Sequence, residues 1–227
     1  MYTYLTGLLK TYKAQIATCS GWYKYDSGVE KRFESPRNVV CLNGREALGV
    51  LHERCYLRAY VWNKLFRREV LDGIRFSTEL SFAEDYEMFC RVLEQCGRIV
   101  CGTKTKYYYM QRKSGVCNCG YDRTYQKAMM MFEDYCRMYS RRYPQYKKLF
   151  ENHYLFDLMG MAAAMSRNGN YVAADCRKIK KYVRQKLPQY LMDKKVSLHL
   201  KGSACMISVS VRAFGAVYRL LHGVESE

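Results

Sequence analysis

Apolar residues at the start of the chain follow helical spacing and then strand spacing. Tyr4, Leu5, Leu8 and Leu9 recur at the intervals of a helix face. Residues 14–19 alternate between apolar and polar side chains, so we expect a helix followed by a strand within residues 1–22. Residues 23–42 are polar and rich in turn residues, which indicates a loop or a hairpin.

Short elements are predicted next. Asn43 is a suitable N-cap for a helix over residues 45–54. A mixed apolar and aromatic stretch over residues 56–66 leads into a short helix at residues 67–71. Asp72-Gly73 would stop that helix.

An amphipathic helix follows, and it opens on two carboxylates, Glu84 and Asp85. Ser81 is the expected N-cap, and Glu84 would complete a capping box with it. Asp85 lies four residues before Phe89, on the apolar side of the predicted helix. An ionisable group directed inward is paired or used, and a general base is one such use. A purely structural role as a capping acid is the alternative that these residues favour when taken alone.

Two extended runs are predicted after this helix, at residues 98–101 and 104–112. In the second run, Lys106, Tyr108, Met110 and Arg112 would face one side, and Tyr107, Tyr109 and Gln111 the other. Three consecutive tyrosines suit a strand that places phenols in a cleft. They suit a strand packed on both faces equally well.

The chain from Tyr121 onward has helical periodicity. One stripe ends at Pro144, a second helix covers about residues 145–166, and a third covers residues 171–186 and stops before Pro188. In the last stretch, residues 203–222, polar residues recur at spacings of four and three: Ser208, Arg212, Gly215, Arg219 and His222. The two arginines interrupt a membrane span, so an interfacial amphipathic helix and a terminal helix docked on the domain remain as alternatives.

The formal net charge of +17 over 227 residues indicates anionic partners. The basic residues are spread widely and no nucleic-acid-binding pattern accompanies them, so an anionic membrane surface is a better match than a specific nucleic acid. The 11 cysteines, without a secretory signal peptide, indicate reduced thiols in the cytosol. We expect no metal site, because Cys117-Asn118-Cys119 lacks a second pair and the four histidines are far apart in the sequence.

The central segments together resemble family 2 glycosyltransferases, which build bacterial surface glycans. The matching pieces, in the family's order, are Trp62-Asn63-Lys64-Leu65, residues 73–76, Glu84-Asp85 and residues 107–114. The last piece has one residue fewer between Arg112 and Ser114 than the family pattern. The match covers about residues 56–115 well and residues 11–22 loosely.

The resemblance implies an inverting sugar transfer from a nucleotide-sugar donor to a glycan or lipid-linked acceptor. Asp85 would be the catalytic base, and Glu84 would support it. The substrate-binding residues would be Trp62, Asn63, Lys64, Tyr109, Arg112 and Ser114. The location implied is the bacterial cytoplasm, with peripheral contact to the inner face of the membrane.

The family's nucleotide-binding motifs are absent from this sequence. A divalent metal, Mg or Mn, is expected for the family, but its Asp-x-Asp ligand motif is missing. We therefore expect an α/β chain: a partial GT-A-like mixed sheet with helices over residues 1–118, the acceptor side, then an α-helical C-terminal region over residues 119–227. A truncated transferase is the preferred interpretation, and a non-catalytic remnant or membrane-associated partner subunit is the alternative.

Overall fold

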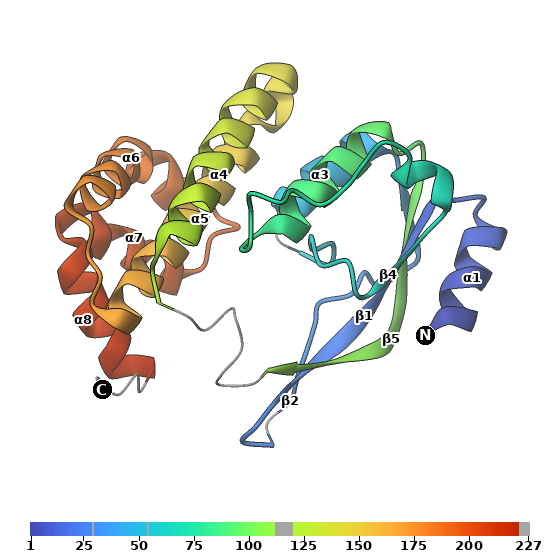
Figure 1. Cartoon of the computed structure of the whole chain (residues 1–227), viewed down its shortest axis with the longest axis horizontal. Helices are drawn as coiled ribbons and strands as arrows, with labels where there is room; N and C mark the ends of the chain where they lie inside the picture. The colour runs from blue at the N-terminus through green and yellow to red at the C-terminus, as the bar shows by residue number, and fades with distance from the viewer. Residues whose placement is uncertain (29, 54, 112–119, 223–227) are drawn as a thin grey trace. The chain divides into compact units, whose positions relative to one another are not determined.

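The computed structural model describes residues 1–28, 30–53, 55–111 and 120–222, with the backbone alone at residue 222 (Figure 1). The chain forms two compact units, Met1–Gly115 and Val116–Glu227. The first combines a mixed sheet with helices, and the described part of the second is helical. The chain is thus mixed α/β, with most of its helix in the C-terminal half.

The sheet of the first unit is organised around β1 (Ile16–Tyr25). Its strand order is β2-β1-β5-β3, and β4 also pairs with β1. β5 (Ile99–Gln111) runs parallel to β1 along one edge. Both β4 (Lys64–Phe66) and β2 (Glu30–Arg32) pair antiparallel with β1, at Ile16–Thr18 and Trp22–Lys24 respectively. The predicted hairpin is therefore present, whereas β4 and β3 (Val40–Leu42) were not foreseen.

Helices cover both faces of β1, so its first six residues are all buried instead of alternating. On one face, Leu5, Leu8 and Leu9 of α1 (Tyr2–Thr11) pack with Ala17 and Val100. On the other face lie α2 (Gly44–His52) and α3 (Glu84–Gln95), where Phe89 of α3 meets Phe66 of β4. Ile16 and Ala17 lie on opposite faces of β1, and both are buried. A strand buried on both faces needs apolar residues on both, so the sequence of β1 alternates only weakly between apolar and polar residues.

The two helix starts of this unit differ in how well the sequence predicts them. Asn43 forms the expected cap, and a full capping box with Glu46. The capping box predicted for Ser81 is wrong. The helix begins at Glu84, and its N-cap is Ala83, which has a left-handed backbone (φ 63°) and makes no side-chain cap. The 67–71 helix is a 3-10 turn at Arg68–Leu71, followed by Gly73 at φ 74°.

The two extended runs predicted at residues 98–101 and 104–112 are one strand, β5. Gly102 lies where a Cβ would approach the Tyr4 hydroxyl to 2.3 Å, so the polar and glycine residues between the runs allow close packing of α1 and do not end the strand. Beyond it the side chains alternate as expected: Tyr108 is exposed, while Tyr107 and Tyr109 are half-buried.

The second unit consists, in its described part, of five α-helices and a 3-10 turn. They are α4 (Arg123–Arg142), the turn Pro144–Tyr146, α5 (Lys147–Asn168), α6 (Ala173–Met192), α7 (Leu198–Val209) and α8 (Val211–His222). α5 is the most buried of these helices, and its residues Leu155, Leu158 and Met165 lie in the core of the unit. Within the ranges described, no helix is both long and apolar enough to cross a bilayer.

Two predicted helix boundaries in this unit are wrong. α6 continues through Pro188 to Met192, because Tyr190 beyond the proline is buried and Gln189 donates to Glu151 and Asn152 of α5. The predicted single helix over residues 203–222 is two helices. They separate at Ser210, whose backbone is extended (φ −153°, ψ 122°) and whose hydroxyl accepts from Ala213 N–H.

Candidate functional site

Asp85 lies in the first turn of α3, on the side that faces the sheet, and it is half-buried. Burial is the largest influence on its carboxyl group and raises its pKa, and the neighbouring Glu84 raises it further. A backbone hydrogen bond from Val61 and the positive charge of Lys64 act in the opposite direction. Asp85 is thus held against the segment that carries Trp62, Asn63 and Lys64, although the sequence separates them by more than 20 residues.

The side chain of Lys64 is buried, with 5% of its surface exposed. Its ammonium donates to Asn63 Oδ1 at 2.9 Å, Arg58 O at 2.8 Å and Tyr60 O. It also lies 4.8 Å from the centre of the Phe89 ring. Burial lowers the pKa of Lys64 to about 7. Its three protons are all used within the protein, so Lys64 shapes the 58–64 segment and supplies positive charge near Asp85.

Asn63 also faces inward. Its side-chain amide donates to Cys19 O at 2.7 Å, and its backbone carbonyl accepts from Cys19 N–H at 3.1 Å. These bonds extend the pairing of β4 with β1 by one residue. The side chains of Asn63 and Lys64 are thus buried, and their hydrogen bonds hold the backbone beside Trp62 in place.

Trp62 is the centre of an aromatic cluster, which we define as Trp62, Tyr60, Phe33, Tyr107 and Tyr109. Its ring stacks on Tyr107 (4.5 Å), Tyr109 (4.9 Å) and Tyr60 (5.0 Å), and Phe33 lies 5.3 Å away. The members are half-buried, so their outer edges remain accessible. β5 supplies Tyr107 and Tyr109, which share one side of the strand, as predicted from the alternation.

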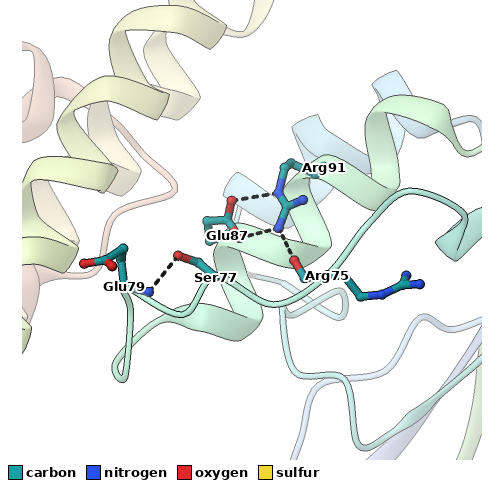
Figure 2. Close-up of polar contacts among 5 residues, drawn as sticks. All are labelled: Arg75, Ser77, Glu79, Glu87 and Arg91. Carbon is teal, nitrogen blue, oxygen red and sulfur yellow. Dashed lines mark hydrogen bonds and ion pairs between the residues drawn. The ribbon is translucent and has the colours of Figure 1, made fainter.

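The loop before α3 is fixed by Arg91. Its guanidinium forms a bidentate ion pair with Glu87 at 2.7 and 2.8 Å, and it also donates to Arg75 O at 2.5 Å (Figure 2). Within the loop, Glu79 N–H donates to Ser77 Oγ. Gln95 donates to Val70 O at the start of this connection. These bonds set the position at which the loop delivers Glu84 and Asp85.

One further buried contact, between His52 of α2 and Tyr86 of α3, was not predicted. His52 Nε2 lies 2.7 Å from the Tyr86 hydroxyl, and Nδ1 lies 2.6 Å from Leu48 O. Burial lowers the pKa of His52 to about 4, so the ring is neutral and Nδ1–H donates to the carbonyl. Nε2 then accepts from Tyr86, the residue directly after Asp85. The four-residue interval from Leu48 to His52 predicts that His52 faces inward, but it does not predict that Tyr86 is its partner.

The remaining predicted site residues are Glu84, Arg112 and Ser114. Arg112 and Ser114 are outside the described residues. Glu84 is half-exposed beside Asp85. Among the residues that the structure describes, no group of three or more His, Cys, Asp or Glu side chains is placed to hold a metal ion. The described residues therefore do not fit the divalent metal that the resemblance implies.

Comparison with known protein families finds no match for the chain, and comparison with curated proteins finds none either. The described geometry offers one carboxylate whose basicity is increased by burial, one buried cation near it, and an aromatic surface on the adjoining segment. A carboxylate of this kind is able to take a proton from a hydroxyl group, and an aromatic edge can pack against an apolar ligand face.

Proposed function

We propose that the chain is the acceptor side of an inverting glycosyltransferase of family 2, with a partial GT-A fold. The observation that carries this proposal is the placement of Asp85 against the Trp62-Asn63-Lys64 segment. These pieces come from separate parts of the sequence, and each belongs to a motif in the resemblance. Their meeting at one place supports a shared site more strongly than the motifs do singly.

In the proposed reaction, the Asp85 carboxylate takes the proton from an acceptor hydroxyl. The hydroxyl oxygen then attacks the anomeric carbon of a nucleotide sugar, and the bond from that carbon to the diphosphate oxygen breaks, with inversion. The nucleoside diphosphate leaves with the bonding electrons. Burial of Asp85 strengthens it as a base, while the nearby charge of Lys64 favours its ionised form before the acceptor binds.

The aromatic cluster is the proposed acceptor surface. Trp62 is stacked with three tyrosines, Tyr60, Tyr107 and Tyr109, so its ring is held in one orientation and loses little entropy on binding. A sugar ring has an apolar face of C–H groups that packs against such an aromatic edge. Glycan or lipid-linked acceptors in the bacterial cytoplasm are the proposed class.

The test is Asp85→Asn in a protein that also carries the missing donor-binding half of the family, supplied as an upstream fusion. We expect transfer to fall by about 10²- to 10⁴-fold, the usual contribution of a general base. Release of nucleoside diphosphate is the measurement. Glu94→Gln, on the exposed side of the same helix, is the matched control and should keep its activity. Full activity of Asp85→Asn would remove Asp85 from the role of base.

A second function is favoured by the inward hydrogen bonds of Asn63 and Lys64. Because both side chains are buried and bonded to groups of the protein itself, they would not bind a phosphate, and the chain would act without catalysis, as a remnant or as the partner of a separate donor-binding chain. Calorimetry distinguishes the two. Absence of heat on titration with nucleotide sugars, together with no transfer by the fused protein, favours the non-catalytic role.

A further inference from the structure

The outward face of α8 is apolar, the reverse of what is usual for a surface helix. Arg212 borders this face, and the residues that form it recur at the spacing of one helix side: Ala213, Ala216, Val217, Leu220 and Leu221. Leu220 is 84% exposed and Leu221 69%. α7 continues the pattern with Leu198, which is 86% exposed, and Val209, which is 69% exposed. We call the outward faces of these two helices the apolar surface.

Inward polar contacts fix α8 in this orientation. Arg219 donates to Ser166 O at 3.0 Å, at the end of α5. Gly215 lies against the Tyr171 hydroxyl, where a Cβ would come within 2.0 Å. Phe214 and Val211 are buried beside them. The predicted polar stripe thus faces the domain at Gly215 and Arg219, and the leucines are left outside.

A hollow of about 350 Å³ opens beside the apolar surface, between α5, α7 and α8. Its walls are mainly apolar, and they include Phe156, Met159, Met206, Phe214, Val217 and Leu221. Val217 and Leu221 belong both to the apolar surface and to the hollow, so the two are continuous. A hollow of this size and lining suits part of a hydrocarbon chain.

The segment that carries the apolar surface has charged residues of one sign. Residues 194–224 contain no aspartate or glutamate, and their cations are Lys194, Lys195, Lys201, Arg212 and Arg219. A second hollow lies at the joint between α7 and α8, where its walls include Arg177, Lys180 and Arg212 beside the exposed Val209. Apolar side chains next to cations match the two layers of an anionic lipid surface, its hydrocarbon and its phosphates.

We propose that α7 and α8 dock the second unit on an anionic bilayer. Leu198, Val209, Leu220 and Leu221 enter the boundary of the hydrocarbon, an acyl chain fills the apolar hollow, and Arg177, Lys180 and Arg212 contact lipid phosphates. A second copy of the chain would suit the apolar surface less well than a bilayer does. A two-fold contact would set the same cations against one another. The proposal is independent of the proposed transfer reaction, because it needs no donor or acceptor.

The test is flotation of the whole chain with vesicles. We expect binding to vesicles of phosphatidylglycerol mixed with phosphatidylcholine, weaker binding to phosphatidylcholine alone, and a decrease with added salt. The double variant Leu220→Ser, Leu221→Ser should bind at least about tenfold more weakly, because two leucines lose burial in the hydrocarbon. Met130→Ser changes an apolar residue that is 60% exposed on α4, away from the apolar surface, and should bind as the unchanged chain does.

Leu198→Ser tests the surface from α7, without touching the packing of α8, and it too should weaken binding. Equal flotation of the unchanged chain and of both leucine variants would overturn the proposal. So would equal binding to neutral and anionic vesicles. A dimer in sedimentation velocity that the double variant dissociates, without vesicle binding by the unchanged chain, would identify a second copy as the occupant instead.

Discussion

Burial shifts the pKa values of Asp85 and Lys64 in opposite directions. For both groups the buried site disfavours the charged form, so the pKa of the carboxyl group rises and that of the ammonium falls to about 7. Their mutual attraction opposes both changes. A carboxylate in this setting is a stronger base than one in water, and loss of the charge on Lys64 would raise its pKa further. The position of Asp85 was predictable from its interval to Phe89, but its buried cation was not.

His52 is the residue at which pH should act most directly on stability. Its pKa is about 4 in the folded chain, against an ordinary value of 6.5. Between these values the unfolded chain binds more protons, so stability is present above pH 6.5 and is lost as pH falls through 4. In His52→Gln we expect a flatter dependence of the urea midpoint across this window. The exposed His199→Gln is the control, and an unchanged slope in His52→Gln would contradict the assignment of a neutral, buried ring.

At the scale of elements, helix ends were harder to predict than helix faces. The apolar stripe of α3 and the cap at Asn43 followed from spacing and local hydrogen bonding. The start of α3 did not, because Ala83 adopts a left-handed backbone that its residue type gives no reason to expect. The break at Ser210 was hidden for another reason: the three- and four-residue spacing of polar residues continues across it.

Pro188 shows how tertiary packing overrides a local signal. It lacks the N–H that would donate to the carbonyl of Arg184, yet α6 continues because Tyr190 and Gln189 are anchored to the unit. We expect Pro188→Ala to raise the free energy of unfolding by about 1 to 2 kcal/mol, after the greater freedom of the unfolded chain is allowed for. Urea denaturation measures this. Destabilisation instead would mean that the ring of the proline packs where alanine leaves a gap.

For the whole molecule, the division into two parts and the class of each part could be predicted from the sequence. An α/β first part and a helical second part followed from the change of periodicity near residue 120. The order of the strands did not, because β4 and β3 have three residues each and no repeating pattern. The aromatic cluster was beyond prediction for the same reason. Trp62, Phe33 and Tyr107 meet only because β1 and its partners bring three distant segments together.

The central place of β1 has a consequence for how the first unit opens. β1 is paired along both edges and covered on both faces, whereas β2 is exposed throughout. Amide protons of residues 16–19 should therefore exchange with deuterated solvent only when the whole unit unfolds, and those of Glu30–Arg32 through local fraying. Mass-spectrometric exchange on peptides from the two strands would measure this. Similar rates in both would mean that the sheet comes apart from its middle, and that Trp62 loses its support before the unit loses its fold.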